Sequence, residues 1–305
     1  MRQFSEDDVC RLLSMREAIE RLRDAFRQLG SGEAVNQVRR RMKLAEGTIL
    51  HSMAGAWRDY LGTKIYVTCP GREPVFLFHL FERSTARHLA LFEANHLGQI
   101  RTGAATGVAI DWLAPKGIVK GALIGAGFQA RGQLEALLEV RTPQEIAVWS
   151  RNELRAAQLV ADFQPRTRTR LYAVVTAEEA VREAEVVITA TSAGTPVVKD
   201  SWLASRVLVC AIGSNYPNRR ELPAELVRTA AVVVDDLEAA KTEAGDLILG
   251  FETEREWDLV KPLAAFADGQ LKPEKERVVF KSVGLGVEDV AVAALVYEKA
   301  TPGQA

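Results

Sequence analysis

Two kinds of residue in this chain are suited to chemistry on a small molecule, a glycine turn and a set of cations. The turn, Gly125-Ala126-Gly127, follows the apolar run 118–124 and precedes the helical run 129–140. Gly125 permits a tight turn, and Gly127 lets backbone amides approach a pyrophosphate. The unpaired N–H groups of the helix N-terminus favour the same anion. A purely structural turn is the alternative, but the strand–turn–helix context favours a dinucleotide site.

The residues after the next predicted strand, 145–150, bear on the choice of nucleotide. An acidic residue at this point of the fold binds the ribose 2′-hydroxyl of NAD. Here the strand ends in Ser150-Arg151-Asn152, without a carboxylate. Ser150 and Asn152 can hydrogen-bond a phosphate, and Arg151 can pair with it bidentately. We therefore predict NADP(H), the alternative being that Asn152 only caps a helix and Arg151 is a solvated charge.

The cations lie in the first third of the chain. Arg40 is on a strand with Arg39 and Arg41 and faces opposite to both. Lys64 lies on an alternating strand and Arg101 opens a helix. Each alone is typical of a solvated surface charge. Together they suit a substrate that carries a carboxylate and a polarised C=O or C=N group.

No other catalytic constellation is evident from the order of the residues. The predicted strand ends contain no Ser–His–Asp set, no Cys–His pair and no cluster with metal-ligand spacing. The four histidines all precede residue 100 and are expected to have packing or surface roles. We therefore predict no metal site.

These residues need elements to position them. An amphipathic helix is predicted over 15–29 because its apolar residues recur every three or four positions. Five strands then follow as an antiparallel meander, and a helix over 99–113 leads into the second half. The predicted strands are 37–44, 48–53, 62–68, 74–81 and 87–92.

From residue 118 onward, strands and helices alternate, which predicts a parallel, doubly wound sheet. A closing helix is expected over 288–300. The predicted fold is α/β, a Rossmann domain over 113–287 plus an α+β substrate-binding and dimerisation domain formed by 1–112 and 288–305. The strands of the sheet are predicted at 118–124, 145–150, 170–175, 186–191, 207–213, 231–235 and 278–283.

Open α/β sheets bind ligands beyond the carboxyl ends of their strands. The cofactor-binding candidates therefore cluster at those ends, with Thr102 added from the connecting helix. They are Thr102, Gly125, Gly127, Phe128, Gln129, Ser150, Arg151, Asn152, Thr191, Ser192, Ile212, Gly213, Ser282 and Gly284.

Composition limits the function classes. The chain has 305 residues, 48% of them apolar, and a net charge of −1. The apolar content is typical of a soluble globular protein. The small net charge gives no electrostatic attraction to nucleic acid or to an anionic membrane. Three widely spaced cysteines indicate a reduced compartment without disulfides. A charged N-terminus and the lack of an apolar run of about 20 residues argue against a signal peptide or a membrane span, so we expect a cytoplasmic protein.

Six segments jointly resemble the ornithine cyclodeaminase/mu-crystallin family, in the family's order and over nearly the whole chain. A further family-like pair, Glu288-Asp289, follows the last of them. The segments are Asn36-Gln-Val-Arg-Arg40, Leu61-Gly-Thr-Lys64, Gln99-Ile-Arg-Thr-Gly-Ala104, Ile124-Gly-Ala-Gly-Phe-Gln-Ala130, Ala211-Ile-Gly-Ser-Asn-Tyr-Pro217 and Phe280-Lys-Ser-Val-Gly284.

The resemblance implies a homodimer built through the first domain and a nicotinamide cofactor, NADP(H) or possibly NAD(H), on the second. It implies that Arg40 and Arg101 bind a substrate carboxylate, with Lys64 beside the reacting carbon. Family members include cyclodeaminases, alanine dehydrogenases and imine reductases. The cyclodeaminase carries an aspartate where this chain has Asn215, and an amide cannot act as a general base.

The presence of Asn215 in place of the aspartate makes a cyclodeaminase less favoured than a reductase, and three functional hypotheses follow. The first is an NADPH-dependent reductase of a 2-imino or 2-oxo acid or ketimine, with Lys64, Arg40, Arg101 and Asn215 at the reaction site. The second is a cyclodeaminase-type lyase that cycles bound NAD(H). The third is a non-catalytic, mu-crystallin-like NADPH-binding protein.

Overall fold

The computed structural model describes residues 1–301, which form two compact units. Residues 1–105 and the segment from Gly284 onward make the first unit, and Thr106–Val283 make the second. Helix α3 (Asn95–Leu113) carries the chain from the first unit into the second.

The first unit is built on a six-stranded sheet with the order β1-β6-β5-β4-β3-β2. All neighbours are antiparallel except β1 and β6, which are parallel. The elements besides α3 are β1 (Arg2–Phe4), α1 (Glu6–Leu12), α2 (Met15–Ser31), β2 (Val35–Lys43), β3 (Ile49–Trp57), β4 (Tyr60–Thr68), β5 (Val75–Glu82), β6 (His88–Glu93) and α10 (Gly286–Ala300).

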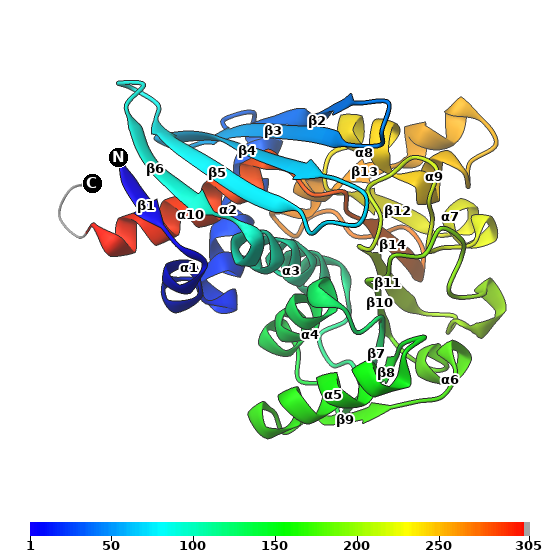
Figure 1. Cartoon of the computed structure of the whole chain (residues 1–305). Helices are drawn as coiled ribbons and strands as arrows, with labels where there is room; N and C mark the ends of the chain where they lie inside the picture. The colour runs from blue at the N-terminus through cyan, green and yellow to red at the C-terminus, as the bar shows by residue number, and fades with distance from the viewer. Residues whose placement is uncertain (302–305) are drawn as a thin grey trace. The chain divides into compact units, whose positions relative to one another are not determined.

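One face of this sheet is covered by α10, which packs on β3 and β4 and also against α2 (Figure 1). Two glycines permit this close approach. A Cβ at Gly55 would lie 2.5 Å from the Val287 nitrogen, and one at Gly286 would lie 2.5 Å from the Ala54 carbonyl oxygen. The N-terminus of α10 therefore lies directly on β3. This brings Glu288 and Asp289, in its first turn, onto the covered face of the sheet.

The opposite face of the sheet carries apolar side chains that remain accessible. Ile65 and Val67 on β4 are 37% and 41% exposed, and Met42 on β2 is 57% exposed. Val75, which pairs with Val67, is also exposed. Strand alternation explains the pattern, because these residues are out of phase with the buried Lys64 and Tyr66.

The second unit is an eight-stranded, wholly parallel sheet with the order β13-β12-β14-β11-β10-β7-β8-β9, which confirms the predicted doubly wound α/β fold. Its strands are β7 (Lys120–Ile124), β8 (Glu145–Trp149), β9 (Arg170–Ala173), β10 (Val186–Thr189), β11 (Val207–Ala211), β12 (Ala231–Val234), β13 (Lys261–Pro262) and β14 (Arg277–Lys281). Its helices besides the end of α3 are α4 (Phe128–Val140), α5 (Glu153–Phe163), α6 (Ala177–Val181), α7 (Ala224–Thr229), α8 (Leu237–Glu243) and α9 (Gly245–Ile248).

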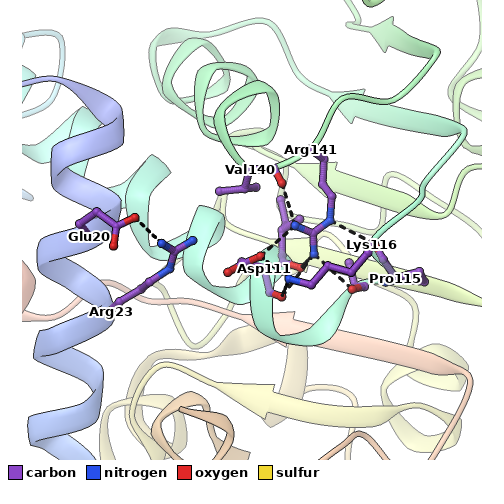
Figure 2. A network of polar contacts seen from close by, with 9 residues as sticks. Glu20, Arg23, Asp111, Pro115, Lys116, Val140 and Arg141 are labelled. Carbon is purple, nitrogen blue, oxygen red and sulfur yellow. Dashed lines mark hydrogen bonds and ion pairs between the residues drawn. The ribbon is translucent and has the colours of Figure 1, made fainter. Parts of the chain in front are cut away.

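The end of α3 is fixed to the end of α4 by one buried arginine (Figure 2). Arg141 donates from Nη2 to the Ile110 carbonyl at 2.9 Å, from Nη1 to Asp111 Oδ1 at 3.0 Å and from Nε to the Pro115 carbonyl at 3.1 Å. These carbonyls belong to the last turn of α3 and the loop after it, where helix carbonyls lack internal partners. The contact anchors the start of the second unit.

The elements that were not predicted from the sequence include β1, α1 and β13. The strands β1 and β13 have only three and two residues, too few to show a period. Helix α1 has seven residues and is held by a capping box in which Ser5 and Asp8 exchange hydrogen bonds. Short elements of this kind depend on their neighbours more than on their own pattern.

Candidate active site

The ammonium of Lys64 is the centre of a buried ionic cluster in the first unit. Lys64 lies on β4, pairs with Met53 and Phe78 across the sheet, and is 3% exposed. Its Nζ donates to Asp289 Oδ1 at 3.1 Å. A Cβ at Gly98 would lie 2.8 Å from this Nζ, so the glycine on α3 leaves the space that the ammonium occupies.

Arg101, one turn further along α3, contacts Asp289 and the neighbouring carboxylate of Glu288. Its Nη1 donates to Glu288 Oε2 at 2.9 Å, and its Nε lies 3.4 Å from Asp289 Oδ1. Gly284 lies against the guanidinium, because a Cβ there would be 2.3 Å from Arg101 Nη1. Gly284 also has a φ of 79°, a conformation that favours glycine. Lys64 and Arg101, which were predicted to act together, do lie together.

The structure places Arg39, and not Arg40, beside this cluster. Arg39 is 8% exposed and its Nη2 donates to the Gly284 carbonyl at 3.2 Å, whereas Arg40 is exposed. The register between β2 and β3 shifts between Gln37 and Arg40, and strand alternation then directs Arg40 to the opposite face of the sheet. The predicted alternation along these arginines is observed, but the prediction that Arg40 lies beside Lys64 and Arg101 is wrong, because Arg39 has that position.

Burial lowers the pKa of Lys64 from its ordinary value to about 8. The removal of water is the largest cause, and the charges of Arg101 and Arg39 lower the pKa further. Asp289 acts in the opposite direction by stabilising the ammonium. An amine with this pKa can hold or release a proton near neutral pH, which is what a general acid or base requires.

In the second unit, the glycine turn after β7 opens a cleft of about 550 Å³. Gly125 has a φ of 119°, and a Cβ there would be 2.4 Å from the Ala190 carbonyl oxygen. Gly127 is the N-cap of α4 and has open space where a Cβ would be. The volume falls within the range typical of cofactor pockets. No side chain therefore blocks the approach of a pyrophosphate to the first backbone N–H groups of α4.

Most of the predicted cofactor-binding residues line this one cleft. Trp149, Arg155 and Ala193 also line it and were not among those candidates. The candidates present are Gly125, Gly127, Phe128, Gln129, Ser150, Arg151, Asn152, Thr191, Ser192 and Gly213.

The side chains after β8 have partly defined roles. Asn152 caps α5, since its Oδ1 accepts from the Arg155 backbone N–H at 3.2 Å. The Ser150 hydroxyl accepts from the Asn152 N–H at 3.3 Å. Arg151 is exposed and lines a recess of the cleft together with Arg155. Asn152 therefore caps the helix, and Arg151 and Arg155 lie at the open edge of the cleft.

The loops after β10 and β11 are joined by a residue that the sequence analysis missed, Glu221. Its carboxylate accepts from the Thr189 hydroxyl at 2.9 Å, from the Thr191 N–H and hydroxyl at 2.7 Å each, and from the Gly213 N–H at 2.7 Å. Burial raises the pKa of Glu221. The backbone N–H of Glu221 donates to Asp246 Oδ1 at 2.6 Å, so the bridge is itself anchored.

A second buried pair supports this bridge. Lys281 at the end of β14 lies 2.9 Å from Asp246 Oδ2, with both side chains fully buried. Its Nζ also donates to the Ser214 carbonyl at 2.6 Å. The carboxyl ends of β10, β11 and β14 are thus joined by a single polar network beside the cleft.

Four predicted cofactor-binding residues, and Asn215 from the predicted reaction site, are not among those that line the cleft. The Thr102 hydroxyl donates to the Gly98 carbonyl at 2.7 Å, and the Ser282 hydroxyl donates to Asp235 Oδ2 at 2.8 Å. The Ile212 N–H donates to the Thr189 carbonyl at 2.9 Å and so extends the pairing of β11 with β10. Gly284 lies against Arg101, as described above, and Asn215 is partly exposed in the loop after β11.

Residues 1–301 contain neither a metal-ligand cluster nor a membrane-spanning helix. No group of three or more His, Cys, Asp or Glu side chains is arranged to hold a metal ion. No helix in this part of the chain is long and apolar enough to cross a membrane.

Comparisons with known proteins identify the family. The sequence profile of the ornithine cyclodeaminase/mu-crystallin family matches residues 3–304. Alanine dehydrogenase of Archaeoglobus fulgidus is 33% identical over 310 residues, which cover 97% of this chain and 94% of the relative.

Solved structures give the same result. Delta(1)-pyrroline-2-carboxylate reductase of Thermococcus litoralis, in complex with NADH and L-proline, superposes with a TM-score of 0.92 at 32% identity and covers 98% of this chain and 97% of its own. An archaeal alanine dehydrogenase dimer with bound NAD has a TM-score of 0.91 at 31% identity, with 98% and 96% covered. The chain belongs to the ornithine cyclodeaminase/mu-crystallin family.

Proposed function

We propose that the protein is an NADPH-dependent reductase that transfers hydride to the C=N bond of a 2-imino acid or ketimine and so forms an amino acid. The observation that carries the proposal is the buried Lys64 ammonium, whose pKa is lowered to about 8 beside Arg101 and Arg39. Relatives over nearly the full length include a reductase of a cyclic imino acid and an alanine dehydrogenase.

In this proposal Arg39 and Arg101 bind the substrate carboxylate, because guanidinium groups suit carboxylates in bidentate geometry. Arg39 takes the role that the sequence analysis gave to Arg40. Lys64 stabilises the charge on the imine nitrogen and is the proton donor to it. Asp289 holds the ammonium in place. The nicotinamide cofactor supplies the hydride when it is bound.

The open space at Gly127, at the N-terminus of α4, supports a dinucleotide as the ligand of the cleft in the second unit. We further propose that NADPH is preferred over NADH, because Arg151 and Arg155 lie at the recess after β8 without a carboxylate at the strand tip. The two solved structures described above contain NADH and NAD, so the proposed preference for NADPH rests on these arginines alone.

A homodimer is the proposed assembly, with the exposed face of the first unit's sheet as the interface. Ile65, Val67 and Met42 give that face an apolar surface that needs a cover. The archaeal alanine dehydrogenase of similar fold is a dimer. We also propose a cytoplasmic location, because three cysteines far apart in sequence suit a reduced compartment.

A cyclodeaminase-type lyase is the second candidate, and a probable ornithine cyclodeaminase of Bordetella pertussis has a similar structure, with a TM-score of 0.91 at 28% identity. Against it stands Asn215, whose amide does not titrate near neutral pH and so cannot act as the general base. The protein offers Lys64 for proton transfer, and reduction of an imine needs no second base.

The test is a turnover screen with NADPH or NADH and a panel of imines. The panel contains 2-oxo acids mixed with ammonia or methylamine, and cyclic imino acids. We expect cofactor oxidation with an equal amount of amino acid formed. Ammonia release from ornithine without net cofactor oxidation would support the lyase, and cofactor binding without any turnover would support a non-catalytic protein.

A further inference from the structure

A second row of polar side chains lies beside the Lys64 cluster on the same face of the first unit's sheet. Cross-strand pairing places Arg41 opposite His51 and His51 opposite Tyr66. Lys64 and Met53 form the neighbouring row, two residues along each strand. Two residues of strand span about 6.7 Å, so the second row is a few C–C bonds from the ammonium.

His51 occupies this row with half of its hydrogen-bonding capacity unused. The imidazole is 1% exposed and stacks on Tyr66, with ring centroids 4.1 Å apart. Its Nε2 lies 3.0 Å from the Thr68 hydroxyl. The other nitrogen, Nδ1, is buried and has no hydrogen-bond partner among residues 1–301. A buried polar atom without a partner is costly, and a site that a ligand completes is one explanation for it.

Charge around this nitrogen favours an anion as the ligand. Burial and then the charges of Arg41 and Arg39 lower the pKa of His51 to about 4, so the ring is neutral at pH 7. A neutral imidazole can donate one N–H, and the guanidinium beside it can pair with a carboxylate. In the tautomer whose Nε2 accepts from the Thr68 hydroxyl, Nδ1 carries the N–H, and together with the positive charge of Arg41 it is suited to a carboxylate and unsuited to an apolar or cationic group.

We propose that the substrate carries a second carboxylate, held by Arg41 and His51, and is a 2-imino dicarboxylic acid of four or five carbons. In this arrangement Arg39 and Arg101 bind the carboxylate next to the imine carbon, and the second row binds the distal one. The inference rests on the proposed imine reduction and adds the substrate class to it.

The experiment compares two substrate classes in the intact protein. Oxaloacetate and 2-oxoglutarate, each mixed with ammonia, represent the dicarboxylates. Pyruvate with ammonia and Δ1-pyrroline-2-carboxylate represent the monocarboxylates. We expect kcat/KM to favour a dicarboxylate by a factor of about 10 to 150, the value of one charge-assisted hydrogen bond.

Two variants and a control locate the effect. Arg41→Gln and His51→Phe should each lower the ratio of kcat/KM values, dicarboxylate to monocarboxylate, by about tenfold or more. Arg40→Gln, a neighbour on the opposite face of the strand, should leave that ratio as it is. Thermal melting of each variant shows whether the fold is kept, and the ratio within one variant is independent of the fraction folded.

The outcomes separate this inference from the proposed function. If the wild-type protein reduces monocarboxylate imines as well as dicarboxylates, or if both variants keep the wild-type ratio, the second carboxylate site is refuted and imine reduction stands. If neither class is reduced although the cofactor binds, the proposed function itself fails.

Discussion

Titration of Lys64 should control the pH dependence of the reaction. With a pKa of about 8, the amine is about nine-tenths protonated at pH 7 and about one-tenth at pH 9. Reduction needs the ammonium, so kcat/KM should be level below this pKa and fall about tenfold between pH 7 and pH 9. Oxidation of the amino acid needs the neutral amine, and its rate should rise through the same pKa.

The substitution Lys64→Met tests the assignment, since it keeps the length of the side chain and removes the charge. We expect turnover to fall by a factor of about 10² to 10⁴, the usual contribution of general acid–base catalysis. The affinity for NADPH should not change, because the cofactor cleft is formed by residues of the second unit. Lys43→Met, at an exposed position in the same unit, is the control.

The assay follows cofactor oxidation at fixed substrate from pH 6 to pH 10, in both proteins and in both directions. The imine itself titrates, but its ionisation affects wild type and variant equally, so their ratio isolates Lys64. A ratio that does not change with pH would refute the reasoning. So would a variant whose activity falls only in proportion to its loss of folded protein.

Three further predictions concern the cofactor, a glycine and the assembly. Arg151→Ala should weaken NADPH binding about 10- to 150-fold, as measured by calorimetry, and should change NADH binding little. Equal losses of affinity for the two cofactors would contradict a contact between Arg151 and the 2′-phosphate. A loss of affinity in the control Arg168→Ala, at an exposed position, would contradict it too. Gly284→Ala should lower kcat/KM at least tenfold, because the added Cβ displaces Arg101. The control is Gly71→Ala, since Gly71 has a similar φ of 72° and open space around it. This control should lower only the free energy of unfolding, by about 1–2 kcal/mol as measured in denaturant. Light scattering should show that the wild-type protein is a dimer. Ile65→Lys should weaken this dimer, and Leu154→Lys, at an exposed position in the second unit, should not. A wild-type monomer at micromolar concentration would refute the interface.

The sequence was sufficient for features that depend on local periodicity. The alternation predicted for the strand of Lys64 is observed, because Lys64 and Tyr66 are buried on one face of β4 and Ile65 and Val67 are exposed on the other. The glycine turn and the Ser150–Asn152 loop were found because strand, turn and helix are contiguous in the chain.

Features that depend on contacts between distant segments were not accessible in the same way. The choice of Arg40 over Arg39 was wrong because an irregular register between two strands determines which side chain faces the cluster. Glu221 was missed because its role comes from loops after β10 and β11 that meet only in the folded sheet. A buried glutamate gives no periodic signal.

The most direct test of the central claim is one stoichiometric measurement. The protein is incubated with NADPH and the imine that gives the fastest oxidation in the screen, and the amino acid formed is quantified by chiral chromatography. We predict one amino acid of a single configuration for each NADPH oxidised, and none with Lys64→Met. Cofactor oxidation without amino acid, or an undiminished yield from Lys64→Met, would contradict imine reduction at this cluster.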